Sequence, residues 1–293
     1  MAIHNKLTEE EIDYIIVNHD RYTCAEFSKQ LNRNKQTIGR VLRDRGLLAK
    51  RPDVHNKVKF NYNFFSDINP ISAYWAGFIA ADGCINERNC LSMGLSSKDS
   101  EHLSLFLKDI NYPLHIRGYT YNGFDISSTS IINKQVVSDL LNIYNITPRK
   151  SLSLRPPTNL PDNIKKYFIA GYFDGDGCFV ICDGKKNGSI TPILHCSIIG
   201  TYEMLSWIKE EFNIIYNRNI KIGCIQKLKS KNNQTYVLSL CTKSAIAFGD
   251  WIYCDSTRYL DRKYKKYKKV KELRPIKQRN FPKGDNDADI STI

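Results

Sequence analysis

The chain has 293 residues, of which 42% are hydrophobic and 25% are charged, and its formal net charge is +13 at pH 7. The hydrophobic share excludes a wholly disordered chain, and the length suits one large domain or two to three small ones. So basic a surface attracts polyanions, and without a basic amphipathic helix or a lipidation motif nucleic acid is favoured over a membrane. No secretory signal is evident, and nine cysteines without disulfide-framework spacing indicate a reducing compartment, so we expect a cytoplasmic protein without a membrane partner.

Residues 1–50 have the pattern of three short helices. Thr8 and the acids that follow it begin the first helix, the second fits Cys24–Leu31, and the third runs from Lys35 to about Arg45. The three-residue turn between the second and third helices is typical of a helix-turn-helix, so we predict a DNA-binding domain, with an ordinary solvated three-helix bundle as the alternative. The residues of the third helix expected to contact DNA are Gln36, Thr37, Arg40 and Arg43.

Residues 51–69 are polar and basic and contain Pro52, which predicts a linker. An internal repeat follows, because Ala73–Ile85 recurs as Tyr167–Phe179. A repeat of this length is typical of a duplicated half-domain, so we expect one half over residues 70–155 and another over 156–270. Residues 271–293 are expected to be a basic and then disordered tail.

Each copy of the repeat predicts a helix in which small residues recur every four positions. Gly77 in the first copy and Gly171 and Gly175 in the second lie on one face, which lets two such helices approach closely. Each helix ends at an Asp-Gly pair, so Asp82 and Asp176 lie at the negative end of a helix dipole and close to one another. Such an arrangement needs a compensating charge, and oxygen ligands favour Mg²⁺. We therefore predict metal-dependent phosphodiester hydrolysis by this pair.

These two segments resemble the LAGLIDADG motif of homing endonucleases in the single-chain form that carries both copies. The resemblance extends from about Ile71 to Lys269 and includes Asn145–Ser151 and Tyr259–Lys263. It implies an α+β fold, with two pseudo-symmetric αββαββα halves that form a saddle of antiparallel sheets across the DNA major groove. It also implies a monomer that cuts both strands of a long asymmetric target and leaves 3′ overhangs, with Mg²⁺ as cofactor and Mn²⁺ as a substitute.

The resemblance assigns roles residue by residue. Asp82 and Asp176, with the adjacent Gly83 and Gly177, would hold the metal. Supporting lysines of the family match Lys98 in the first half and Lys243 in the second. Since each lysine has no counterpart in the other half, equal cutting of the two strands is in doubt.

Alternating strands and charged turns predict the DNA contacts of the two halves. Arg117 is a candidate for pairing with guanine, and Arg88 lies in a turn that would reach along the duplex. The other predicted contacts are His115, Tyr119, Lys185, Lys186, Lys221, Lys227 and Lys229. The alternatives to a nuclease are a non-cleaving DNA-binding regulator and a maturase that binds intron RNA on the same scaffold.

Overall fold

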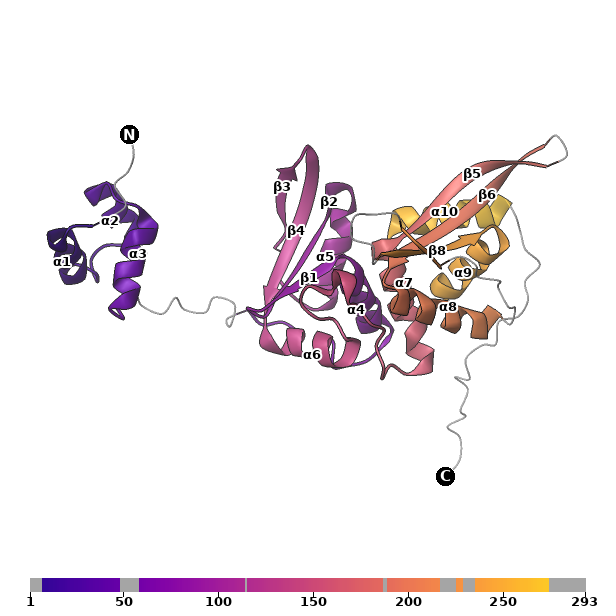
Figure 1. Cartoon of the computed structure of the whole chain (residues 1–293), viewed down its shortest axis with the longest axis horizontal. Helices are drawn as coiled ribbons and strands as arrows, with labels where there is room; N and C mark the ends of the chain where they lie inside the picture. Colours follow the sequence, from indigo (N-terminus) through magenta and orange to yellow (C-terminus); the bar gives the residue numbers. More distant parts are fainter. Residues whose placement is uncertain are drawn as a thin grey trace, which may run out of the picture. The chain divides into compact units, whose positions relative to one another are not determined.

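The computed structural model describes residues 7–47, 58–113, 115–186, 189–216, 225–228 and 235–273. Backbone contacts divide the chain into two units, Met1–Val58 and Lys59–Ile293 (Figure 1). Within the described residues, no helix combines the length and the apolar character that crossing a membrane requires.

The first unit consists of α1 (Glu9–Val17), α2 (Cys24–Leu31) and α3 (Lys35–Asp44). Capping boxes begin the first two helices, because the hydroxyls of Thr8 and Thr23 accept backbone hydrogen bonds while glutamates three residues later reach back. The three predicted helices are therefore confirmed. Their apolar faces meet in a core of their own that consists of Ile15, Phe27, Ile38 and Leu42.

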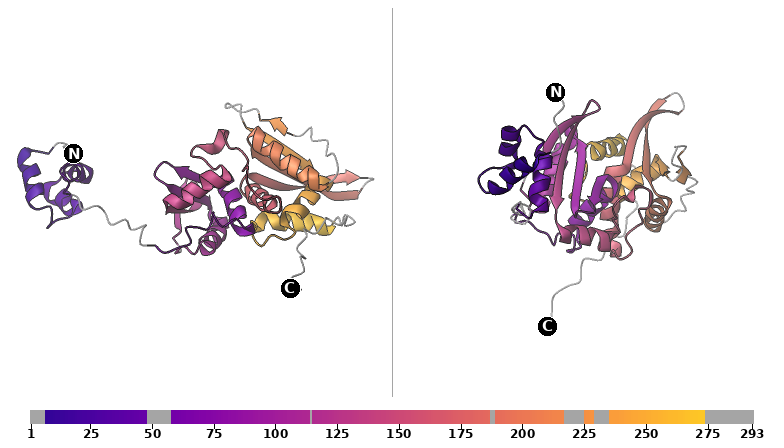
Figure 2. Two further views of the ribbon diagram at one scale, coloured as in Figure 1. Left: turned by 90° about the horizontal axis from the view of Figure 1, so that it is seen from below. Right: turned by 60° about the vertical axis from the view of Figure 1, so that its left-hand side comes forward.

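The second unit contains two copies of an αββαββα arrangement (Figures 1 and 2), as the sequence predicts. The elements of the first half are α4 (Pro70–Asp82), β1 (Gly83–Asn86), β2 (Cys90–Ser96), α5 (Ser100–Asp109), β3 (Arg117–Tyr121), β4 (Phe124–Ile132) and α6 (Lys134–Tyr144). Those of the second half are α7 (Asp162–Asp176), β5 (Gly177–Lys186), β6 (Ser189–Gly200), α8 (Tyr202–Tyr216), β7 (Ile225–Lys227), β8 (Tyr236–Cys241) and α9 (Lys243–Tyr253), followed by α10 (Asp261–Leu273).

Each half forms a four-stranded antiparallel sheet, in the orders β1-β2-β4-β3 and β5-β6-β8-β7. Alternate residues of the long strands are buried, for example Leu91 and Met93 in β2 and Leu194 and Ile198 in β6. Helices of the same half pack on these buried faces, and the opposite face of each sheet is open. The β3–β4 and β5–β6 hairpins project to the same side of this unit (Figures 1 and 2).

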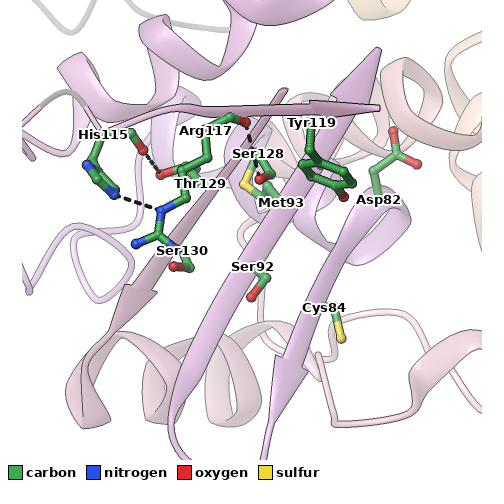
Figure 3. A pocket seen from close by; sticks show the side chains of 11 residues that line it. Asp82, Cys84, Ser92, Met93, His115, Arg117, Tyr119, Ser128, Thr129 and Ser130 are labelled. Carbon is green, nitrogen blue, oxygen red and sulfur yellow. Dashed lines mark hydrogen bonds between the residues drawn. The ribbon is translucent and has the colours of Figure 1, made fainter. Parts of the chain in front are cut away.

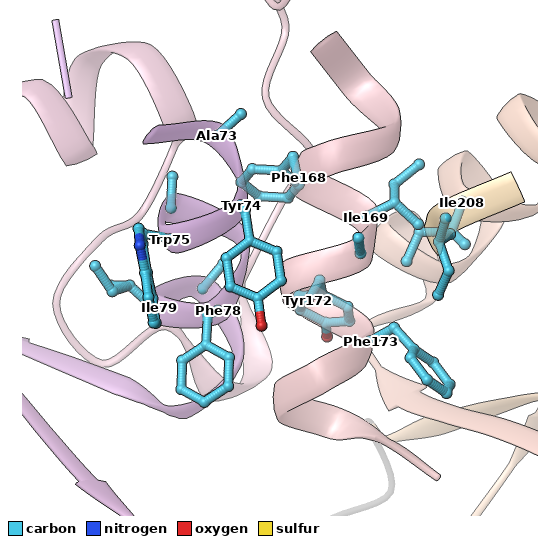
Figure 4. Packing of buried hydrophobic residues seen from close by; sticks show 14 of the residues in the cluster. Ala73, Tyr74, Trp75, Phe78, Ile79, Phe168, Ile169, Tyr172, Phe173 and Ile208 are labelled. Atoms are coloured by element: carbon cyan, nitrogen blue, oxygen red, sulfur yellow. The ribbon is translucent and has the colours of Figure 1, made fainter. Parts of the chain in front are cut away.

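The two halves meet through α4 and α7, which pack side by side (Figure 4). The contact depends on glycine: a Cβ atom at Gly77 would collide with the backbone carbonyl of Phe168, and one at Gly171 would collide with that of Tyr74. The small-residue face predicted from the repeat is therefore the surface on which the two helices touch. Large side chains surround the contact, and Tyr74 and Phe168 are fully buried.

The expected linker is shorter than the sequence suggested. Residues 51–57 lie outside the described residues, but from Lys59 onward the chain belongs to the second unit. Phe64 and Phe65 are buried in its core, and the Tyr144 hydroxyl donates a 3.1 Å hydrogen bond to the Phe65 carbonyl. The sequence analysis did not identify Phe64 and Phe65 as core residues because their neighbours in the sequence are polar. At the other end α10 continues to Leu273, and the rest of the predicted tail lies outside the described residues.

The C-terminal segment of the second half crosses back to the first. Arg258 forms a bidentate pair with Asp109 on α5, with both N–O distances at 2.6 Å, and the Trp75 indole donates to the same carboxylate at 2.7 Å. Arg262 on α10 pairs with Asp99 at 2.9 Å. These charge-assisted bonds attach α10 and the segment before it to the first half.

Candidate active site

The two repeated aspartates lie at adjacent helix ends. Asp82 is the last residue of α4 and Asp176 the last of α7, and the following glycine begins a strand in each half. A Cβ atom at Gly175 would touch the Ala81 side chain and lie 3.4 Å from the backbone nitrogen of Asp82. The glycine-mediated contact between the helices therefore brings their carboxyl ends together, as the sequence predicts.

The surroundings of this pair disfavour its charged form. Burial, together with the neighbouring charge of Asp82, raises the pKa of Asp176 to about 6. The pKa of Asp82 is also raised by desolvation, although part of its side chain is exposed. Two lysines, Lys150 and Lys263, act against both shifts. A carboxylate pair of this kind is a site at which positive charge is stabilised.

The two lysines bind the ends of the two aspartate helices. The Lys150 ammonium donates to the carbonyls of Ala81 at 3.2 Å and Gly83 at 2.6 Å, at the end of α4. At the end of α7, the Lys263 ammonium donates to three carbonyls in a row, those of Phe173, Asp174 and Gly175, at 2.9, 2.6 and 3.0 Å. Both lysines are buried, and burial lowers their pKa.

This lysine pair changes the electrostatic interpretation of the aspartates. An ammonium at a helix C-terminus offsets both the dipole and the carboxylates. The protein itself thus partly balances the negative charge of Asp82 and Asp176 from which we predicted a bound cation. The cation stays a prediction. The sequence reasoning missed Lys150 and Lys263, although a signal was available. An Arg-Lys pair follows the last helix of each αββαββα half, at residues 149–150 after α6 and at residues 262–263 after α9.

The two halves of the site differ beside their aspartates. The Tyr172 hydroxyl on α7 donates a 3.1 Å hydrogen bond to the Ile199 carbonyl, and its position beside Asp176 lowers the pKa of that carboxyl. The repeat places Phe78, which has no hydroxyl, at the equivalent position of α4. Beside Asp82, the charge of Arg262 lowers the pKa of that carboxyl and the charge of Asp99 raises it. The two carboxylates therefore have different surroundings.

Asp174, which the first copy replaces with Ala80, has a structural role. It is fully buried and accepts hydrogen bonds from the Tyr74 and Tyr253 hydroxyls at 2.8 and 2.7 Å and from the Leu260 backbone N–H at 2.7 Å. Because the single Tyr74 proton is donated to Asp174, His102 Nε2, 3.0 Å away, is the donor in its bond to that hydroxyl. This network ties α4, α7 and α9 to the chain just before α10, which carries Lys263.

The exposed face of the first sheet begins at Asp82. A pocket there is lined by Asp82, Cys84, Ser92, Arg117 and Tyr119, among others (Figure 3). Arg117 donates from Nε to His115 Nε2 at 3.0 Å, which orients its guanidinium on this face. Three predicted DNA contacts, His115, Arg117 and Tyr119, thus lie beside a candidate catalytic aspartate.

The other predicted site residues are more scattered. Lys98, in a short 3-10 turn after β2, and Lys243, the first residue of α9, are exposed, and neither is among the main charges that act on Asp82 or Asp176. Their supporting role stays a prediction.

The predicted DNA contacts away from the pocket are mostly exposed. On α3, Gln36, Arg40 and Arg43 are exposed and Thr37 is half-buried. Arg88 is exposed in the turn between β1 and β2, and Lys227 is exposed on the edge strand β7. Lys185 and Lys186 belong to the β5 backbone, their side chains are not described, and Lys221 and Lys229 lie outside the described residues.

The donor set at the site fits a hard divalent cation only in part. Two carboxylates converge, but among the described residues no group of three or more carboxylate, imidazole or thiol side chains could hold a metal ion. The carbonyl of Gly83, one of the predicted metal-binding residues, accepts a 2.6 Å hydrogen bond from Lys150. Mg²⁺ is commonly bound by one or two protein carboxylates together with substrate phosphates and water. The aspartate pair is therefore suited to a cation that a phosphodiester helps to bind.

No protein-family model and no curated protein sequence matches the chain. Among solved structures, it is similar to the meganuclease I-SmaMI bound to uncleavable DNA, with a TM-score of 0.45 and 16% identity over 69% of this chain and 90% of that one. It is also similar to the LAGLIDADG homing endonuclease I-LtrWI bound to target DNA (TM-score 0.47, 14% identity, 73% and 90% covered) and to the LAGLIDADG meganuclease I-AabMI bound to uncleaved DNA (0.46, 13%, 70% and 91%). At such low identity, the functional conclusion rests on the residues of the site.

Proposed function

We propose that the protein is a site-specific endonuclease of the homing type that hydrolyses a phosphodiester in each strand of double-stranded DNA. The observation that carries this proposal is the matched pair Asp82 and Asp176, held together by glycine-packed helices between two sheets whose outer faces are open. A net charge of +13 supports a polyanionic substrate. Two unlike halves in one chain support a long asymmetric target cut by a monomer, with 3′ overhangs expected from the repeated motif.

Each group of the site has a defined task in this reaction. Asp82 and Asp176 would hold Mg²⁺ or Mn²⁺, which, when bound, lowers the pKa of a coordinated water and stabilises charge on the leaving oxygen. Lys150 and Lys263 lower the pKa of both aspartates, which favours the charged form at neutral pH. Their bonds to the helix-end carbonyls fix the backbone on which the aspartates are placed.

The first unit is proposed to supply a second DNA contact. Gln36, Arg40 and Arg43 recur at helical spacing on α3 and are exposed, as recognition of the major groove through a helix-turn-helix requires. The intron RNA role and the cytoplasmic location stay proposals that follow from the sequence.

The decisive experiment incubates the purified chain and Mg²⁺ with DNA that spans the uninterrupted form of its own genomic insertion site. We expect specific cutting, which is lost in Asp82→Asn and in Asp176→Asn while binding is retained. Asp162→Asn is a matched control, because this exposed aspartate lies at the opposite end of α7. Cutting that survives both site substitutions would refute the proposal, and tight specific binding without any cutting would favour the regulator.

A further inference from the structure

The exposed faces of the two sheets differ in chemistry. On the first, the rows across the strands are Cys84–Ser92–Ser130, Gly94–Ser128–Arg117 and Ser96–Ile126–Tyr119, and the exposed Phe124 and Ile132 of β4 lie on the same face, which therefore combines hydroxyls and apolar groups with one guanidinium. On the second, the rows are Cys178–Ser197–Ser239 and Val180–His195–Cys241, next to Cys182 and Ile199. The second face therefore combines thiols and branched aliphatic side chains with two serines and one histidine.

The apolar side chains and thiols on the open face of the second sheet are exposed to solvent. The Val180 and Ile199 side chains are 44% and 43% exposed, and Cys178, Cys182 and Cys241 are exposed thiols. The opposite face of the same strands is buried under helices through residues such as Phe179 and Leu194. Cys178 follows Asp176 by two residues, so this face begins at the candidate active site, as the first face begins at Asp82.

Base recognition in the major groove depends on which side chains a protein surface presents. Guanine is read by bidentate Arg or Lys, whereas thymine presents a C5 methyl group that makes apolar contacts. Over the described rows of the second face from Cys178 to Cys182, no Arg or Lys side chain is present. A thiol is a weak donor, and Val and Ile have no polar side-chain atom.

We propose that the second half of the protein selects thymine in its half of the DNA target, through contact of Val180 and the neighbouring thiols Cys178, Cys182 and Cys241 with thymine methyl groups. The inference deepens the proposed function and rests on it, because the open sheet face must lie in the major groove. The first half differs in that it presents a guanidinium, Arg117, which is able to read guanine on its own face.

The test uses the full-length chain in EDTA, which prevents cutting, and a pool of random-sequence duplexes from which bound DNA is selected. In the selected duplex, deoxyuridine then replaces thymine in one half of the site at a time, which removes only the methyl groups. We expect weaker binding by roughly fourfold for each contacted methyl in the half of the site that the second sheet reads. In Val180→Ala the loss for the contacted methyl should shrink towards none, whereas Ser92→Ala, on the first face, should leave it unchanged.

The outcomes separate this inference from the function on which it rests. The thymine assignment is overturned, with site-specific binding intact, if deoxyuridine does not weaken binding of the selected sequence. It is also overturned if the sensitivity to deoxyuridine disappears in Ser92→Ala but persists in both Val180→Ala and Cys178→Ser. A pool from which no sequence is enriched overturns both. Because Val180 and Cys178 are exposed, neither substitution removes a core contact.

Discussion

The substitution Gly171→Ala tests the physical basis of the whole site, which is the close contact between α4 and α7. The added Cβ would collide with the Tyr74 carbonyl oxygen and lie 2.8 Å from both the Tyr74 carbonyl carbon and the Phe78 nitrogen. All three atoms belong to the backbone of α4, so no side-chain rotation relieves the clash and the helices must separate. A separation of 0.5 to 1 Å already forfeits about a quarter to a half of a dispersion contact.

We therefore expect Gly171→Ala to lower the free energy of unfolding by about 3 kcal/mol, the upper part of the range for overpacked cores. All three tryptophans, at positions 75, 207 and 251, belong to the second unit, so tryptophan fluorescence during urea denaturation reports on that unit. Any variant that still folds should also cut DNA more slowly, since its aspartates are displaced.

The matched control is Gly118→Ala on β3, where nothing lies within 4 Å of the added Cβ. It should change the free energy of unfolding by less than about 0.5 kcal/mol. If Gly171→Ala were no more destabilising than this control, the helix contact would not be as close as described. The explanation for the position of Asp82 and Asp176 would then be wrong.

Two further results are expected at the site. Because burial and the charge of Asp82 raise the pKa of Asp176 to about 6, the single-turnover cleavage rate should fall about tenfold per pH unit below pH 6, and a flat profile down to pH 5 would contradict this. Lys263→Met should destabilise the second unit by about 3 kcal/mol, because three carbonyls lose a buried cationic donor. It should also move the pH profile of cleavage to higher pH, because Lys263 lowers the pKa of both aspartates. Lys266→Met removes the same charge from an exposed position on α10 and should do neither.

Much of this protein is determined by local sequence patterns. The three N-terminal helices follow from caps and apolar spacing, and the two halves follow from the repeat that ends in Asp82 and Asp176. Caps and apolar spacing involve only a few neighbouring residues, and the repeat is found by comparing two segments of the sequence. Both can therefore be recognised without knowledge of the fold. The glycine spacing predicted even the contact between α4 and α7, because only a close backbone approach requires it.

Tertiary structure alone decided which distant groups meet around the aspartates. Lys150 reaches carbonyls 67 and 69 residues earlier in the chain, and Lys263 reaches carbonyls 88 to 90 residues earlier. A lysine in a basic loop has the same local sequence whether it is solvated or buried against a helix end. Long-range packing makes that choice, because only the folded chain presents unpaired carbonyls and paired carboxylates within reach of one ammonium group.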